Sequence, residues 1–317
     1  MAARGLARPW RRWVDLAPYW YLASYPKSGN TWCRVFITEL RRLAQLDQPE
    51  ATAVAEAQER DQRLQGLRLN RDLATGSIVS SRHWLDDQLG INSSDLSFAE
   101  LDRVRGRLGH QPALYDEALR YHKVHDAFTS PDSAGQPVVA TGGCAGVVYV
   151  MRHPADVAVS LSHFFRWDLG RCVQFLLDPE ASLCQSAKRG GSQVRQFLGR
   201  WDFHVNSWCG QGSLPLLRLR YEDLLADPIE QFRRLAAFLQ LPAGPDLIAE
   251  AVANTQFEQL RAKEQQEGGF HERPVGCERF FRSGRSGEGR ELIDPDQFEQ
   301  LQSRLAAPLQ QHGYPLL

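Results

Sequence analysis

The chain has no uninterrupted apolar run long enough to cross a membrane, and charged residues and a proline break up its first residues before they reach the length of a secretion signal. It also lacks an excess of either charge, because 37 lysines and arginines stand against 38 aspartates and glutamates. A chain that mainly binds nucleic acid would be expected to carry a basic excess. We therefore expect a protein without a membrane span and without a nucleic-acid partner.

Paired cysteines are missing as well. The six cysteines are scattered along the 317 residues without a Cys-x-x-Cys pair: Cys33, Cys144, Cys172, Cys184, Cys209 and Cys277. Without that spacing, neither a zinc site nor a disulfide framework is predicted. Reduced thiols in a cytoplasmic enzyme that holds no metal are the expectation.

An ordinary nucleotide-phosphate loop is absent too, because the Walker A pattern GxxxxGK-S/T places a glycine before its lysine. In YPKSGNTW, residues 25–32, Lys27 instead precedes Gly29. Apolar residues 19–24 predict a strand before this segment, and apolar residues at helical spacing from Trp32 predict a helix after it. A helix N-terminus presents unpaired N–H groups to an anion, and Lys27 adds a full charge. The segment predicts an anion-binding loop, and an ATP-dependent kinase is the weaker interpretation.

A second strand–turn–helix is predicted where the apolar, β-branched residues 146–151 run into Arg152 and Pro154. Proline suits the first position of a helix, and an apolar stripe continues after it. A magnesium-dependent nucleotide hydrolase would be expected to have an acidic residue at this strand end. Arg152 offers a bidentate fork to a phosphate instead, and Ser160 follows two turns into the helix.

A third segment, FFRSGRSGEGR at residues 280–290, is rich in arginine and glycine. Its composition predicts an exposed, mobile loop that attracts anions. We call residues 280–290 the lid segment.

These segments resemble the sulfotransferases that use 3′-phosphoadenosine-5′-phosphosulfate (PAPS) as donor, over about residues 19–290. The first segment is similar to the family's 5′-phosphosulfate loop and the second to its 3′-phosphate motif. The lid segment is similar to the RKGxxGDW loop, with Ser283 for the usual lysine and Glu288-Gly289 for Asp-Trp. Weaker similarities surround Tyr221 and Phe257. The resemblance implies these donor-binding residues: Lys27, Ser28, Gly29, Asn30, Thr31, Trp32, Arg152, Ser160, Tyr221, Thr255, Phe257, Arg282, Ser283 and Gly284.

The resemblance also implies a catalytic histidine. YHKVHD, residues 121–126, is similar to the family's strand-end KTH segment, which makes His125 the candidate general base. His122 is the rival, and residues three apart on a strand point to opposite faces, so only one can face the donor. Lys27 would neutralise the bridging oxygen as its bond to sulfur breaks. Cations and helix N–H groups can stabilise such a transfer without a metal.

The predicted fold is a three-layer α/β sandwich with a mostly parallel central sheet and a P-loop-like phosphosulfate-binding loop at the strand C-terminal ends. Residues 1–317 are predicted to form a single sulfotransferase domain. Residues 48–109 interrupt the strand–helix rhythm and are predicted to be an inserted cap.

The predicted function is in-line sulfuryl transfer from PAPS to a hydroxyl, or less favourably an amine, of a small-molecule acceptor. The sequence does not identify that acceptor. Two alternatives stay open: a P-loop kinase, which would need ATP and magnesium, and a nucleotide-binding protein without catalytic activity. The family's dimer motif KxxxTVxxxE is not recognisable after Arg290, so the oligomeric state also stays open.

Overall fold

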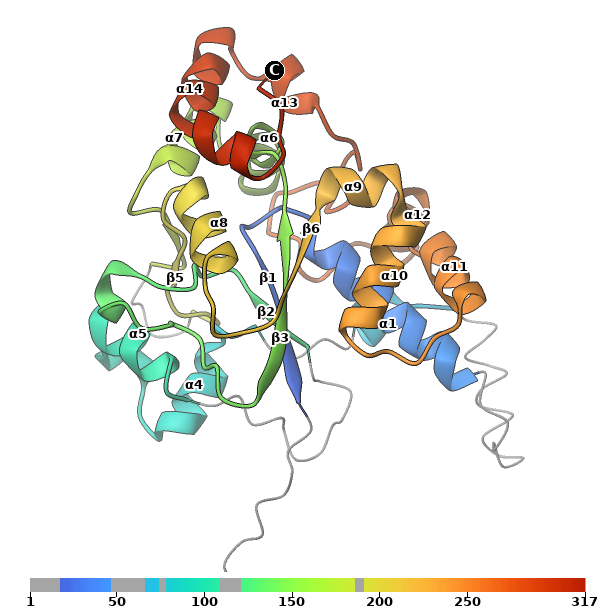
Figure 1. The fold of residues 1–317 in the computed structure, drawn as a ribbon, viewed down its shortest axis with the longest axis horizontal. Coiled ribbons are helices and arrows are strands. Elements are labelled where there is room, and N and C mark those ends of the chain that lie inside the picture. The colour runs from blue at the N-terminus through green and yellow to red at the C-terminus, as the bar shows by residue number, and fades with distance from the viewer. Residues whose placement is uncertain (1–17, 47–65, 74–77, 109–120, 186–190, 317) are drawn as a thin grey trace, which may run out of the picture.

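The computed structural model describes residues 18–46, 66–73, 78–108, 121–185 and 191–316. Its centre is a parallel sheet of four strands in the order β2-β1-β3-β6 (Figure 1). The strands are β1 (Tyr19–Ser24), β2 (Tyr121–Val124), β3 (Cys144–Met151) and β6 (Leu216–Arg220). A short antiparallel pair, β4 (Ser182–Leu183) with β5 (Gln196–Phe197), forms a separate sheet. The predicted parallel sheet is confirmed.

Alternating side chains along β1 divide the core into two layers. Tyr21 and Ala23 belong to one hydrophobic cluster, and Trp20 and Leu22 belong to the other. The first cluster is covered by α6 (Pro154–Phe165), α7 (Leu169–Leu177), α8 (Trp201–Cys209) and α14 (Pro295–Gln311). The second is covered by α1 (Asn30–Leu46), α10 (Pro228–Phe238) and α11 (Pro245–Asn254). Figure 1 shows these two helix groups on opposite sides of the sheet, so the three-layer prediction is confirmed.

The predicted strand–turn–helix units are also present. β1 leads through the loop into α1, and β3 leads into α6, whose first residue is Pro154. β6 runs directly into the short α9 (Tyr221–Ala226). Because all four strands are parallel, their C-terminal ends gather at one edge of the sheet, where α/β folds bind ligands.

The predicted cap, residues 48–109, lies partly outside the described residues. Its described parts form α3 (Leu69–Asp72), α4 (Arg82–Leu89) and α5 (Phe98–Arg105). α3 is held to the end of α12 (Phe257–Gln266), where Glu267 accepts the Leu69 and Asn70 amides at 2.6 and 2.8 Å. The role of this region as an inserted cap stays a prediction. None of the helices in the described residues is long and apolar enough to span a membrane.

Candidate functional site

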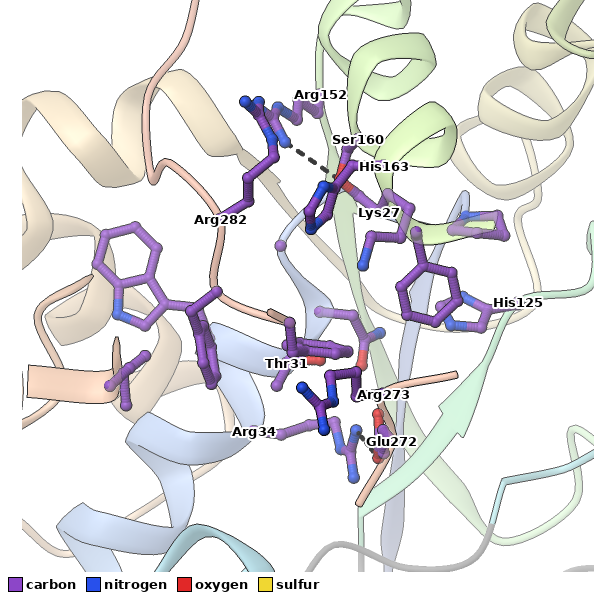
Figure 2. A pocket seen from close by; sticks show the side chains of 18 of the residues that line it. Lys27, Thr31, Arg34, His125, Arg152, Ser160, His163, Glu272, Arg273 and Arg282 are labelled. Carbon is purple, nitrogen blue, oxygen red and sulfur yellow. Dashed lines mark hydrogen bonds and ion pairs between the residues drawn. The ribbon is translucent and has the colours of Figure 1, made fainter. Parts of the chain in front are cut away.

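A cavity of about 1010 Å³ is lined by residues that follow the C-terminal ends of all four strands (Figure 2). It brings together most of the residues predicted to bind the donor or to catalyse transfer. They are Lys27, Gly29, Asn30, Thr31, Trp32, His125, Arg152, Ser160, Tyr221, Phe257, Arg282, Ser283 and Gly284. Ser28 and Thr255 are buried and do not line the cavity, and the Thr255 hydroxyl donates to the Ala251 carbonyl at 2.7 Å. Donor binding by these two residues therefore stays a prediction.

Residues 25–32, which we call the phosphosulfate loop after the family segment they resemble, have a sequence that backbone geometry explains. Gly29 has a φ of +106°, and a Cβ there would lie 2.7 Å from the Tyr221 ring, so a larger residue would meet both strain and a clash. Asn30 fastens the start of α1 to β1, since its side-chain amide donates to the Leu22 carbonyl at 2.8 Å. Lys27 adopts a left-handed φ of 71°, which is uncommon for a residue with a Cβ and typical of binding sites.

The Lys27 ammonium group lies between two aromatic rings. Its Nζ is 3.8 Å from the centre of the Phe164 ring and 4.4 Å from that of Phe280. Burial, together with the neighbouring charges of Lys123 and Arg152, lowers the pKa of Lys27 to about 7. An anion bound beside Nζ would favour the charged form and raise this pKa again.

Arg152 connects the phosphosulfate loop with the lid segment. Its side chain is 7% exposed, and its guanidinium lies 4.4 Å above the centre of the Tyr221 ring. One amino group donates to the Arg285 carbonyl at 2.8 Å and the other to the Lys27 carbonyl at 3.4 Å. The ring and the two carbonyls hold the guanidinium at the cavity wall.

Glu288 organises the cations of the lid segment. This residue begins α13 (Glu288–Leu292) and is buried, although the lid segment was predicted to be exposed. Its carboxylate forms an ion pair with Arg282 and accepts a hydrogen bond from the Ser283 hydroxyl at 2.6 Å. The two departures from the family pattern, Ser283 and Glu288, therefore contact each other.

Asp156 of α6 anchors the same segment from the other side. Its two carboxylate oxygens accept the backbone amides of Gly287 and Gly289, each at 2.8 Å. A Cβ on Gly289 would lie 2.4 Å from the Cβ of Ala155, so only glycine allows this close approach. The prediction of an exposed loop is wrong for Glu288 and Gly289, which are buried, because the Asp156 carboxylate holds this part of the segment against α6 by hydrogen bonds that the sequence did not reveal.

His125 follows the last residue of β2 and lines the cavity, as predicted. Its Nδ1 lies 2.9 Å from the Ser24 carbonyl, which can only accept, so Nδ1 carries the proton and Nε2 keeps its lone pair. Burial, with the charge of Lys123, lowers the pKa of His125 to about 3, so the ring is neutral at neutral pH. His122 does not line the cavity and is buried, with its ring edge-on to that of Tyr19 at 5.4 Å.

The sequence did not single out a charge cluster, largely withdrawn from solvent, that lines the same cavity. Glu272 lies 2.7 Å from Nη1 of Arg34 and 3.0 Å from Nζ of Lys123. Burial alone would raise the pKa of Glu272, but the two cations outweigh burial and lower it to about 2. Arg34 lies one helical turn after Thr31, so helical spacing could have placed it beside the loop. Nothing in the sequence around Glu272 marks it as a partner.

Comparisons with known proteins agree with this geometry. A family model described as "Sulfotransferase domain" matches residues 19–313. The flavonol 3-sulfotransferase of Flaveria bidentis is 24% identical over 294 residues, which cover 89% of this chain and 78% of the relative. The cytosolic sulfotransferase 8 of Arabidopsis thaliana is 26% identical over 307 residues, which cover 93% and 78%.

Solved structures share the fold. The mouse sulfotransferase SULT7A1 complexed with PAP has a TM-score of 0.55 at 19% identity, and the alignment covers 94% of this chain and 86% of that one. A retinol dehydratase in complex with androsterone and PAP has a TM-score of 0.57 at 18% identity, with coverages of 92% and 80%.

Proposed function

The chain belongs to the sulfotransferase domain family, and on this premise we propose that it transfers the sulfuryl group of PAPS to a hydroxyl, or an amine, of a small-molecule acceptor. The observation that carries the proposal is the meeting of Lys27, His125 and Arg152 in one cavity, each just after a different parallel strand. Two relatives of known structure were solved with PAP, adenosine 3′,5′-bisphosphate, which is what PAPS becomes after transfer. We propose a cytoplasmic location as well, since one curated relative is named a cytosolic sulfotransferase.

In the proposed reaction, the acceptor oxygen attacks sulfur in line with the bond that breaks. The sulfur–oxygen bond to the 5′-phosphate breaks, and its electron pair leaves with PAP. Nε2 of His125 takes the acceptor's proton, because Nδ1 is engaged by the Ser24 carbonyl. Lys27 stabilises the charge that develops on the bridging oxygen.

Donor class is tested first, by calorimetry with PAP and with ATP, each with and without magnesium. The proposal expects PAP to bind tightly without magnesium and ATP to bind weakly. Magnesium-dependent ATP binding in preference to PAP would favour the kinase alternative. A panel of phenols, alcohols, sugars and amines is then offered with labelled PAPS. If PAP binds but no member of the panel receives labelled sulfate, the result would favour a nucleotide-binding protein without catalytic activity. Among the described residues, no three metal-ligating side chains are grouped to hold an ion, and independence from metal stays a prediction.

Replacing Arg152 with alanine should weaken PAP binding by about 30- to 900-fold, which corresponds to roughly 2–4 kcal/mol, because it truncates one side of a desolvated charge pair. Binding of 5′-AMP, which lacks the 3′-phosphate, should change far less. Calorimetry measures the affinities of PAP and 5′-AMP for the same variant. A general loosening of the loop would weaken the binding of both ligands. Equal weakening of the two ligands would show that Arg152 does not recognise the 3′-phosphate.

Replacing Lys27 with alanine should lower kcat by about a hundredfold or more while donor binding changes less, because the lost interaction strengthens in the transition state. Since the pKa of Lys27 is lowered to about 7, donor binding one pH unit above that value should take up a proton in the wild type and not in the variant. Calorimetry in buffers of different ionisation enthalpy measures this uptake.

The matched control for Lys27 is Lys263→Ala. Lys263 does not line the cavity, and its ammonium group donates to the Leu67 carbonyl at 3.1 Å. This variant loses the same charge and should keep kcat and proton uptake. Unchanged kcat in Lys27→Ala, with only a raised KM for the donor, would show that Lys27 merely binds the ground state.

A further inference from the structure

The cavity contains more cations than the proposed donor site uses. Lys27, Arg152 and Arg282 are assigned to the donor. Three further cations also line the cavity: Arg34, Lys123 and Arg273. The acidic lining residues are Glu258, which is exposed at the start of α12, and Glu272. Because Glu272 is shared between Arg34 and Lys123, these three residues together keep one positive charge.

Arg273 adds a second charge, and among the described residues no carboxylate lies within ion-pair distance of it. Its guanidinium donates to the Glu278 carbonyl and lies against Gly269, where a Cβ would come within 2.9 Å of Nη2. The side chain is half-buried and lines the cavity, and only one of its N–H donors is engaged by the Glu278 carbonyl. A fixed guanidinium with free donors suits bidentate binding of a planar anion.

The backbone that carries Arg273 is itself held in place. The Asn70 side chain donates to the Gly269 carbonyl at 2.7 Å and accepts the His271 amide at 2.7 Å. Figure 2 shows Arg273 near Arg34 and Glu272, on the other side of Thr31 from Arg152 and Arg282. An anion bound by Arg273 would therefore be a different group from the donor's 3′-phosphate.

We propose that the acceptor is an anionic molecule, with a carboxylate or a similar acidic group that Arg273 binds while its hydroxyl faces His125. The inference rests on the proposed function, because it names the acceptor class of the same site. Apolar lining residues supply surface for the rest of the acceptor: Ile78, Phe164, Phe165, Leu183 and Phe280. An apolar body with an acidic end fits this combination of surfaces.

The test uses a series of ω-(4-hydroxyphenyl)alkanoates with increasing spacer length, each paired with its methyl ester. The wild type should sulfate the best-fitting acid with a kcat/KM about tenfold to a hundredfold above that of its ester. Arg273→Gln should remove this preference by raising KM for the acid, while kcat for the ester and the affinity for PAP stay unchanged. Arg279→Gln is the matched control, because Arg279 carries the same charge six positions after Arg273, is exposed and does not line the cavity.

Calorimetry measures binding of the same pairs to the enzyme–PAP complex, so the answer does not depend on turnover. Equal binding and equal turnover of acid and ester at every spacer length would overturn the inference. Weakened PAP binding in Arg273→Gln would also overturn it, since Arg273 would then serve the donor. Preferential binding of the acids that is lost in Arg273→Gln, without sulfate transfer, would support the anion site at Arg273 and count against the proposed function instead.

Discussion

Replacing His125 with alanine should lower turnover by about a hundredfold to ten-thousandfold, the usual contribution of a general base. The ring is held at the cavity wall by the Ser24 carbonyl, which fixes the proton on Nδ1 and leaves Nε2 to accept the acceptor's proton. Alanine removes that proton acceptor without removing a residue of the proposed phosphate-binding loop. Transfer of labelled sulfate from PAPS to an acceptor from the panel measures the effect, expressed per PAP-binding site so that unfolded protein is not counted.

His122→Ala is the matched control, because it removes the same kind of side chain three residues earlier, within β2. His122 does not line the cavity, and its ring packs edge-on to that of Tyr19. Its loss should therefore leave turnover per PAP-binding site close to that of the wild type, and both variants should still bind PAP. Normal turnover in His125→Ala with an inactive His122→Ala would reverse the catalytic assignment.

The phosphosulfate loop could be predicted from sequence because its requirements are local. Gly29 must adopt a positive φ, and Asn30 must fasten the helix start to a strand only eight residues away. Arg152 and Pro154 similarly follow one continuous apolar strand, so strand, turn and helix are contained in one short segment. The parallel sheet followed from the same alternation of strands with helices.

The charges beside the proposed acceptor site could not be predicted, because their partners lie far apart in the chain. Arg34 and Glu272 are separated by 238 positions, and Glu272 follows no recognisable motif. Glu288 is visible in the sequence only as a substitution in the lid segment, whereas the structure pairs it with Arg282 and Ser283. Tertiary packing decides these contacts, and single-residue propensities carry no information about them.

Another long-range contact joins the region predicted as a cap to the segment that follows β2 and carries the candidate base. Arg105 of α5 is 1% exposed, and its guanidinium donates to both carboxylate oxygens of Asp126 at 2.9 and 2.7 Å. Asp126 follows His125 directly, and its backbone carbonyl accepts the Trp208 indole N–H at 2.9 Å. The end of β2 is thus held in position by a buried ion pair.

Replacing Arg105 with alanine should lower the free energy of unfolding by about 3–5 kcal/mol, the usual cost of removing one partner of a buried ion pair. Asp126 would remain buried, with its side chain accepting the Phe197 amide at 3.2 Å but without a guanidinium to balance its charge. The double variant Arg105→Ala/Asp126→Ala should be less destabilised than the sum of the single variants, because it removes the uncompensated charge. Urea unfolding of the wild type and the three variants, followed by tryptophan fluorescence, gives the coupling free energy between Arg105 and Asp126.

The surface pair Arg233 and Glu230 provides the comparison that makes this result specific. Its guanidinium and carboxylate also lie 2.7 Å apart, but the two side chains are 57% and 42% exposed. Water screens such a pair, so Arg233→Ala should change the unfolding midpoint far less than Arg105→Ala. If the two substitutions prove equally mild, the buried pair does not hold α5 to the end of β2, and His125 must owe its position to the Ser24 carbonyl and the surrounding packing alone.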